Sequence, residues 1–190
     1  MSTTAEARAV LEFWFGPAPH ATRGEWFRKD PVFDAAIRAR FAATIAEALA
    51  GGLGDWCADA HGVLARVIVL DQFTRNVYRD TPRAFAGDAR ALATAGYAIE
   101  RGVERDLDGF ERWFLYLPFE HSEDPAMQER SLALFAKLAA DTGERSPLEW
   151  AEKHAAVIRR FGRYPHRNEI LGRASTPEEI AFLEEPGARF

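Results

Sequence analysis

A single cysteine, Cys57, is all that the 190-residue sequence contains, so no disulfide can form within the chain. A chain of this length buries roughly 70% of the surface that its unfolded form exposes, and it therefore needs no disulfide or metal to hold it together. A lone thiol suits a reducing compartment, because small secreted proteins commonly rely on paired cysteines. We therefore expect a cytoplasmic protein.

Long apolar runs and targeting segments are also missing. The most apolar window, residues 63–70, is interrupted by Arg66 and is far shorter than the roughly 20 residues that a membrane helix needs. The apolar stretch of residues 9–15 follows Glu6 and Arg8, and it is too short and too acidic for a signal peptide. We therefore predict no membrane partner.

Positive charge is scarce, with 24 lysines and arginines against 29 aspartates and glutamates, which gives a formal net charge of -5. Because a negative chain is repelled by nucleic-acid phosphates and by anionic lipids, we predict no nucleic-acid partner. Only 3 of the 24 basic residues are lysines. Arginine is thus the ordinary base of this protein, and an arginine-rich segment is weaker evidence for an anion site than it would be elsewhere.

The common sequence motifs of catalysis and cofactor binding do not occur. The chain has no G-x-G-x-x-G, no G-x-x-x-x-G-K-[ST], no H-E-x-x-H and no G-x-S-x-G. We therefore predict no cofactor and no metal, and the sequence leaves open whether the protein is an enzyme. His20 and His61 stand apart from other polar clusters, and we interpret them as residues of the surface or the edge of the core.

Helical periodicity extends along nearly the whole chain. Asp30-Pro31 has the residue types of a helix start, and residues at a spacing of four then form one apolar face: Phe33, Ile37, Phe41, Ile45 and Leu49. Residues 59–73 are apolar on most sides, which predicts a central helix. No alternating β-branched run bounded by turns occurs, so we expect no strands.

Helix ends are also marked in the sequence. Gly162 ends a helix that begins at Pro147, and Pro118 is predicted to end a short aromatic helix over residues 108–117. The capping-box pattern occurs at Thr3–Glu6, Ser146–Glu149 and Thr176–Glu179. About eight helices with short connections follow from these signals. Because no linker or low-complexity tract divides the chain, we predict a single all-α domain over residues 1–190.

Polar residues gather in three segments, of which residues 71–79 are the first. Asp71 and Arg75 stand four positions apart and can pair on one helix face. In one interpretation Arg75 presents its guanidinium to a carboxylate or phosphate, with Asn76 beside it. In the other, Asn76 takes the left-handed conformation at a helix C-terminus while Arg75 caps carbonyl groups.

The second polar segment, residues 117–125, contains Glu120, His121 and Glu123. A histidine between carboxylates suits general acid–base chemistry near neutral pH, so His121 and Glu123 are the candidate catalytic residues. A metal held by this segment with His154 or His166 is a less favoured alternative, because no two histidines have the spacing of a metal-binding helix. In a third interpretation the acidic side chains only favour the dipole of the following helix.

The third segment, residues 159–173, holds five arginines against one acidic residue. Gly162 and Pro165 predict irregular backbone between them, and binding residues concentrate in such loops. Planar donors in a loop suit an anion, and the candidate ligands are Arg163, His166, Arg167 and Asn168. The alternative is that these arginines pair with the excess of acidic residues inside the fold.

Four ordered motifs resemble the bacterial domain-of-unknown-function 924 family, and together they cover nearly the whole chain. They are Leu11–Phe15, Leu70–Asn76, Pro118–Glu123 and Phe161–Asn168, with Leu171–Arg173 after the last. Thr74 stands where the family has proline and Phe119 where it has leucine, and neither change removes a polar candidate. The resemblance implies a tetratricopeptide-like array of antiparallel helix pairs and implies no activity. By position the family motifs fall on Asp71, Arg75, Asn76, Glu120, His121, Glu123, Arg163, His166, Arg167 and Asn168.

We therefore predict a polar pocket that binds, or acts on, a small anionic metabolite. Arg75, Arg163 and Arg167 would hold the anion, the two asparagines would orient it, and His121 with Glu123 would move protons in any chemistry. The alternative is a module that binds a protein or peptide partner in the groove of its stacked helix pairs. In a further alternative the same residues form buried ion-pair networks that stabilise the helix array. The oligomeric state is not set by the sequence.

Overall fold

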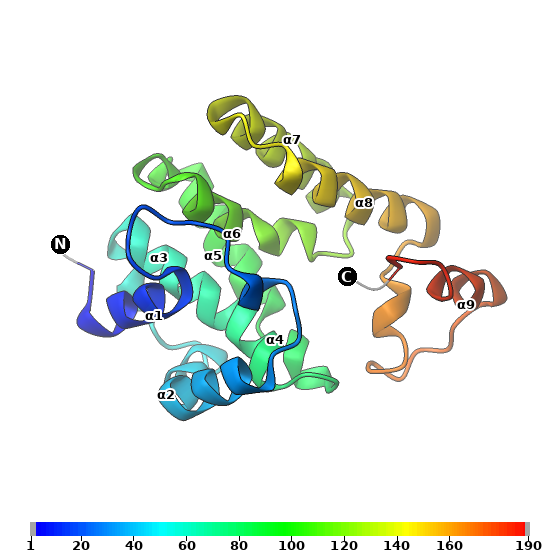
Figure 1. Ribbon diagram of the computed structural model, residues 1–190, viewed down its shortest axis with the longest axis horizontal. Helices are drawn as coiled ribbons and strands as arrows, with labels where there is room; N and C mark the ends of the chain where they lie inside the picture. Colours follow the sequence, from blue (N-terminus) through cyan, green and yellow to red (C-terminus); the bar gives the residue numbers. More distant parts are fainter. Residues whose placement is uncertain (1–2, 189–190) are drawn as a thin grey trace. The chain divides into compact units, whose positions relative to one another are not determined.

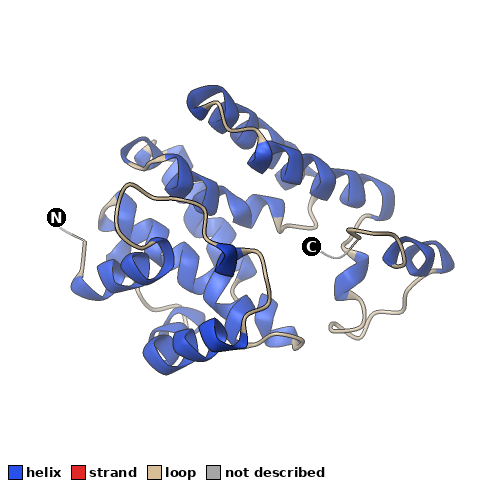
Figure 2. Ribbon diagram, viewed as in Figure 1, coloured by secondary structure: helices blue, strands red, loops and turns tan. Residues whose placement is uncertain are grey.

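The computed structural model describes residues 3–188, and helices are the regular secondary structure in that range (Figure 2). The all-α prediction is confirmed. The α-helices, labelled in Figure 1, are α1 (Ala5–Phe15), α2 (Pro31–Leu49), α3 (Ala60–Val67), the single-turn α4 (Thr74–Val77), α5 (Asp88–Glu100), α6 (Gly109–Glu120), α7 (Pro125–Thr142), α8 (Ser146–Phe161) and α9 (Pro177–Leu183). The part of the N-terminal targeting prediction that concerns residues 1 and 2 lies outside the described residues.

No helix within residues 3–188 combines the length and the apolar character that crossing a membrane requires.

The chain forms two compact units. The first comprises Met1–Arg79 and Arg83–Pro118, and the second comprises Asp80–Pro82 and Phe119–Phe190. The prediction of a single domain stays a prediction, as does the tetratricopeptide-like arrangement of the helices.

An aromatic cluster forms the core of the first unit. The apolar face of α1 predicted from the sequence is buried, and Trp14 on that face is fully enclosed. Its ring lies 5.4–6.3 Å, centroid to centroid, from four other rings, which belong to Trp26, Phe33, Phe73 and Phe114. These partners come from separate segments of the chain, so one side chain joins much of this unit together.

Helix α2 begins as the sequence predicts. The Asp30 side chain accepts hydrogen bonds from the backbone N–H groups of Val32 and Phe33, and Pro31 occupies the first helical position. The predicted apolar face is buried at Phe33, Ile37, Phe41 and Ile45. Leu49, at the end of the series, is only partly buried.

The predicted helix of residues 59–73 does not keep one geometry. After α3 the chain widens into a π-helical segment, η3 (Ile68–Phe73), and then returns to α-helix in α4. All six residues of η3 are buried, including Asp71 and Gln72. The side chain of Thr74, the first residue of α4, donates to the carbonyl of Leu70 within η3. The segment therefore carries polar side chains into the interior.

In the second unit, α7 and α8 lie side by side (Figure 1). Gly143, at φ 78°, ends α7 in the left-handed conformation and lets the chain turn back within a few residues. The buried face of α8 consists of apolar residues and one histidine, His154. Tyr164, which follows α8 in the chain, packs with Val157 and Ile158 of that helix in a small core. Phe161 and Phe182 lie at the edge of this core.

The structure corrects the predicted end of the aromatic helix. Pro118 does not terminate α6, which continues to Glu120. A proline costs one backbone hydrogen bond in a helix, but the residues on either side of it, Leu117 and Phe119, are buried. Packing of this last turn offsets the lost hydrogen bond. The helix therefore extends to Glu120, which belongs to the second unit.

Two of the three predicted capping boxes are wrong. Thr4, not Thr3, caps α1, and Thr3 instead donates to Asp59. Ser146 is the first residue of α8 and its side chain forms no cap. The third box is confirmed at the start of α9, where the side chain of Thr176 accepts from the N–H of Glu179 and the Glu179 carboxylate accepts from the N–H of Thr176.

Candidate functional site

The first predicted segment belongs to the first unit, where Arg75 is held by carboxylates. Its guanidinium donates two hydrogen bonds to Asp88, of 2.8 and 3.0 Å, and a third to the backbone carbonyl of Asp71 at 2.7 Å. The Asp71 carboxylate also lies 3.0 Å away, so the predicted pair of Asp71 and Arg75 is confirmed. Both edges of the guanidinium therefore contact acidic residues of this unit.

Asn76 belongs to the same arrangement. Its side-chain amide donates to Asp34 at 2.7 Å, and Arg79 donates to both oxygens of the same carboxylate. Asn76 lies within α4 and does not take the left-handed conformation, which corrects that interpretation of the helix end. The side chains that follow η3 thus tie it to α2 and α5.

The second and third segments both belong to the second unit, and the structure brings them together. Arg167 donates to the backbone carbonyl of His121 at 3.0 Å. The N–H of Tyr164 donates to Glu123 at 2.8 Å, and the Tyr164 hydroxyl donates to the carbonyl of Glu120. Residues separated by more than 40 positions in the sequence are therefore in direct contact.

Two arginines of the third segment form internal ion pairs. Arg163 donates to the two carboxylate oxygens of Glu179 at 2.6 and 2.8 Å, and Arg173 donates to those of Glu123 at 2.7 and 3.0 Å. Asn168 donates to Glu179 as well, at 3.2 Å. The interpretation that arginines of this segment pair within the fold is confirmed for these two and, at exposed positions, for Arg159 with Glu129 and Arg160 with Glu178. The hydrogen bond from Arg173, with that from Tyr164, holds the pKa of Glu123 below its ordinary value although burial opposes the shift.

Glu179 is the centre of one of these networks, and its ionisation should couple stability to pH. Hydrogen bonds from Arg163 lower the pKa of Glu179 from 4.5 to about 2. Because the folded-state pKa is the lower one, the stabilisation is complete above pH 4.5 and is lost as the pH falls toward 2. We expect Glu179→Gln to lower the free energy of unfolding at pH 7 by about 2 kcal/mol. This is less than the free energy that corresponds to the whole pKa shift, because solvent screens the charge of the partly exposed Arg163.

Urea denaturation of the wild type and the variant at pH 7 and pH 3 measures this effect, with hydrogen exchange of α9 to detect local opening. The variant should lose less stability on acidification than the wild type does. Glu178→Gln is the matched control, because Glu178 is an exposed neighbour that pairs with the exposed Arg160. If Glu178→Gln lost as much stability as Glu179→Gln, the role of Glu179 as the centre of this network would be contradicted.

His154 is a buried histidine with a defined tautomer. Its Nδ1 lies 2.9 Å from the carbonyl oxygen of Trp150 and 3.2 Å from a carboxylate oxygen of Glu120. A carbonyl oxygen only accepts, so Nδ1 carries the proton and Nε2 of the neutral ring keeps its lone pair. Burial lowers the pKa of His154 to about 3, the hydrogen bond to the Trp150 carbonyl opposes the shift, and the charges of His121, His166 and Arg167 act in the same direction as burial. The ring is therefore neutral at neutral pH.

Rings and charged groups surround Tyr164 on several sides. The Tyr164 ring lies 5.6 Å from that of His154 and 5.5 Å from that of His166, and the guanidinium of Arg167 lies 4.6 Å from its centre. Gln128 donates to the Tyr164 hydroxyl at 2.9 Å, and burial raises the pKa of that hydroxyl. We call this group of six residues the His154 cluster: Glu120, His121, His154, Tyr164, His166 and Arg167.

Sequence reasoning considered His154 only as a ligand in the less favoured metal alternative and did not select Tyr164 or Gln128 as site residues. For His154 a signal was present, because it shares the apolar face of α8 with Ala151 and Ile158, and a titratable residue on such a face is unusual. For Gln128 no local signal existed. Its burial depends on contacts with the carbonyls of Glu120 and Ser122, which the fold brings to it.

A cleft of about 620 Å³ lies in the first unit, and none of the predicted site residues lines it. Its walls include Phe13, Phe15 and Phe33, with Arg23 and Arg40 among the polar side chains. Arg40 lies over the rings of Phe13 and Phe41, at 4.9 and 5.1 Å from their centres. This cleft was not predicted from the sequence, because its lining forms only when α1, α2 and the loop between them come together.

The weighed metal alternative at Glu120, His121 and Glu123 is not supported. Within residues 3–188, the side chains whose possible ligand atoms all lie within 4.8 Å of one another are instead His20, Asp108 and Glu111, in the first unit. His20 was not assigned to a site from the sequence.

Comparison with known proteins gives a family and a related fold. The profile of a family described as bacterial proteins of unknown function (DUF924) matches residues 10–187. A solved structure, described as that of a protein of unknown function from Agrobacterium tumefaciens, is 39% identical with a TM-score of 0.88, over 97% of this chain and 100% of that one. No curated protein matches the chain.

Proposed function

Because the chain belongs to the DUF924 family of bacterial proteins of unknown function, its role has to be argued from its own residues, and we propose that the His154 cluster binds a small anionic molecule. The observation that carries the proposal is the gathering of Arg167 and three histidines around the buried carboxylate of Glu120. In a protein whose net charge is negative, the cationic Arg167 and the histidines His121 and His166 lie beside the neutral, buried ring of His154.

Electrostatics supports this choice among the charged groups of the second unit. Arg163 and Arg173 each already donate to both oxygens of a carboxylate, that of Glu179 and that of Glu123. By contrast, the pKa of His154 is depressed by burial and further by the charges of His121, His166 and Arg167. A site with such a positive potential is stabilised by a bound anion.

The proposal gives the candidate residues different parts. Arg167 would supply a planar pair of donors for a carboxylate or phosphate, and His121 and His166 would add hydrogen bonds. Arg75 and Arg163, which the sequence also suggested as anion ligands, would act as structural partners of acidic residues. Asp71, Asn76 and Asn168 would then support those pairs.

If the protein is also an enzyme, His154 is better suited to move a proton than Glu123. The Trp150 carbonyl and the Glu120 carboxylate hold Nδ1 and so fix the orientation of the ring, whose Nε2 carries the lone pair of a proton acceptor. Glu123 is bound on both oxygens by Arg173 and is ionised, which makes it a positioning residue. A cytoplasmic location, which the lone Cys57 suits, is part of the same proposal.

The test is a thermal-shift series with inorganic phosphate, pyrophosphate, succinate and citrate. An anion at 100 times its dissociation constant stabilises the folded state by about 2.7 kcal/mol, which raises the Tm by roughly 5–10 °C in a chain of this size. We expect Arg167→Lys, which keeps the charge but loses the planar donor pair, to weaken the binding at least about tenfold.

Arg40→Lys is the matched control, because Arg40 belongs to the first unit and lines the cleft there. This variant should bind the anion as the wild type does. If Arg40→Lys no longer bound the anion while Arg167→Lys bound it as the wild type does, the binding site would lie in the cleft, which would contradict the proposal. If none of the anions shifts the Tm and Arg167→Lys is strongly destabilised, the cluster is a structural network.

A further inference from the structure

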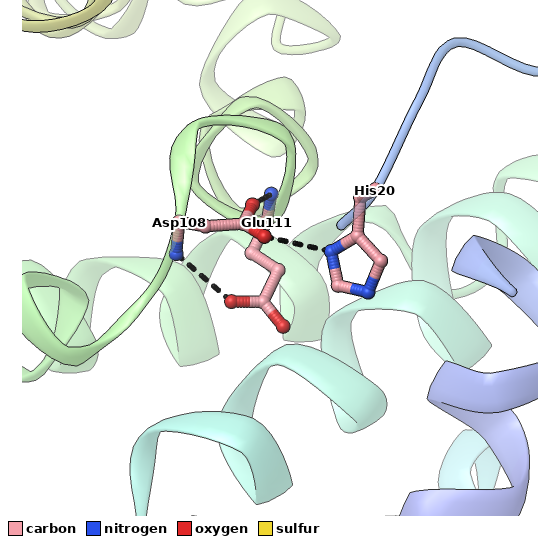
Figure 3. Close-up of side chains that lie close together, drawn as sticks. All are labelled: His20, Asp108 and Glu111. Carbon is pink, nitrogen blue, oxygen red and sulfur yellow. Dashed lines mark hydrogen bonds and ion pairs between the residues drawn. The ribbon is translucent and has the colours of Figure 1, made fainter. Parts of the chain in front are cut away.

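We propose that His20, Asp108 and Glu111 (Figure 3), together with His61, form a binding site for a divalent transition metal, zinc above all, in the first unit. The inference concerns a different unit from the His154 cluster and does not depend on anion binding. It rests on four side chains that approach one another from three parts of the chain.

The start of α6 fixes both carboxylates. Asp108 accepts a hydrogen bond from the N–H of Glu111 through Oδ1, and Glu111 accepts one from the N–H of Asp108 through Oε2, each at 2.9 Å. This reciprocal cap uses one oxygen of each carboxylate and leaves the other available. The cap therefore holds two acidic side chains next to each other without using all of their acceptor capacity.

Each remaining oxygen faces an imidazole nitrogen. Oδ2 of Asp108 lies 2.7 Å from Nδ1 of His20, which points toward it in Figure 3. Oε1 of Glu111 lies 3.4 Å from Nε2 of His61. His20 comes from the loop after α1 and His61 from α3, so only the folded unit brings these atoms to the start of α6.

The spacing of these atoms suits a zinc ion. Zinc bonds to nitrogen and oxygen are about 2.0–2.2 Å long, so the ligand atoms of a tetrahedral site lie roughly 3.3–3.6 Å apart. The atoms of His20, Asp108 and Glu111 lie within 4.8 Å of one another, and the distance from His61 to Glu111 already falls in the tetrahedral range. Small rotations of the side chains are enough to close the site.

The surroundings hold the ligands and leave them accessible. The ring of His20 stacks on that of Phe15 at 5.0 Å, and its side chain is 13% exposed. Glu111 is 7% exposed, whereas the side chains of Asp108 and His61 are each 46% exposed, which gives an ion a way in. Within the described part of the chain, neither carboxylate pairs with a lysine or an arginine. A divalent cation would therefore meet two carboxylates that no fixed positive charge neutralises.

The set of donors selects the type of metal. Two imidazole nitrogens and two carboxylate oxygens suit zinc, whereas calcium and magnesium prefer oxygen ligands alone. Four protein ligands make a closed site of the structural type, which would join the loop after α1 to α3 and α6. Metal binding at such a site stabilises the folded state, because the unfolded chain does not hold the four ligands together.

The experiment titrates metal-free protein with Zn²⁺ in competition with a chromophoric chelator, and records the Tm and the absorption spectrum with Co²⁺. We expect one Zn²⁺ per chain, a higher Tm with the metal, and the spectrum of tetrahedral Co²⁺. His20→Asn, His61→Asn and Asp108→Asn should each weaken zinc binding at least about tenfold. Asparagine at position 108 still caps α6, so the last variant should fold without metal as the wild type does.

Glu129→Gln is the control, because it removes an exposed carboxylate of the second unit and should leave zinc binding unchanged. Zinc bound with wild-type affinity by His20→Asn and Asp108→Asn would place the ion elsewhere and overturn the proposal. Absence of binding up to about 1 mM Zn²⁺ would overturn it as well. Wild-type affinity in His61→Asn alone would overturn the four-ligand site.

Discussion

Replacing Trp14 with alanine is expected to lower the free energy of unfolding by about 4 kcal/mol, since large-to-small changes of a buried aromatic residue cost roughly 3–5 kcal/mol. Trp14 is fully buried, and its ring contacts four other aromatic rings of the first unit. The cavity left by the indole is bounded by rigid rings that cannot collapse to fill it. Urea denaturation followed by circular dichroism measures the loss.

Trp150→Ala is the matched control, because the same atoms are removed from a side chain that is 42% exposed. We expect this change to cost about 1 kcal/mol or less. Trp14→Phe should cost clearly less than Trp14→Ala, because it keeps a ring and removes an indole N–H that has no hydrogen-bond partner among the described residues. Equal decreases in the free energy of unfolding for Trp14→Ala and Trp150→Ala would contradict the role of Trp14 as the core residue that joins this unit together.

Replacing Gly87 with alanine is expected to destabilise the protein by about 3 kcal/mol, the upper range for forcing atoms into a packed interior. A Cβ at Gly87 would lie 2.0 Å from the carbonyl oxygen of Leu70 and 2.8 Å from its carbon, so backbone has to move. Leu70 belongs to the π-helical segment η3. The start of α5 therefore approaches that wide turn at a distance that only glycine permits.

Gly96→Ala is the control, and we expect it to change the stability in the opposite direction. Gly96 lies inside α5, and a Cβ there would meet no atom within 4 Å. Alanine favours a helix over glycine by about 0.5–1 kcal/mol, so this variant should be more stable than the wild type. Thermal and urea denaturation of the two variants compare them directly. A Gly87→Ala protein as stable as the wild type would show that α5 does not approach Leu70 this closely.

The elements that the sequence predicted well are those with local causes. Asp30 and Thr176 cap α2 and α9 as their residue types indicate, and Gly162 ends α8 in the left-handed conformation. Hydrogen bonds between a side chain and the next turn depend on a few neighbouring residues only. For this reason such signals can be read directly from the chain.

The errors arose where distant contacts compete with local preference. Pro118 remains helical because the turn around it is buried, and residues 68–73 take a π-helical form that no residue type specifies. Thr3 bonds to Asp59, 56 positions away, and leaves the cap of α1 to Thr4. In each case burial or a distant partner outweighs a local preference, which is worth about 3 kcal/mol for the helical proline and about 1 kcal/mol for a helix cap.

The sequence by itself determined that the protein is all-α, where most of its helices begin and end, and which family motifs it carries. Only the tertiary structure decided which polar residues meet: Arg75 with Asp88, Arg163 with Glu179, His154 with Glu120, and His20 with Asp108. Helical periodicity acts over four residues and is visible in any window of the chain. The pairing of charges 13 to 88 positions apart depends on how whole helices pack, and no local pattern encodes it.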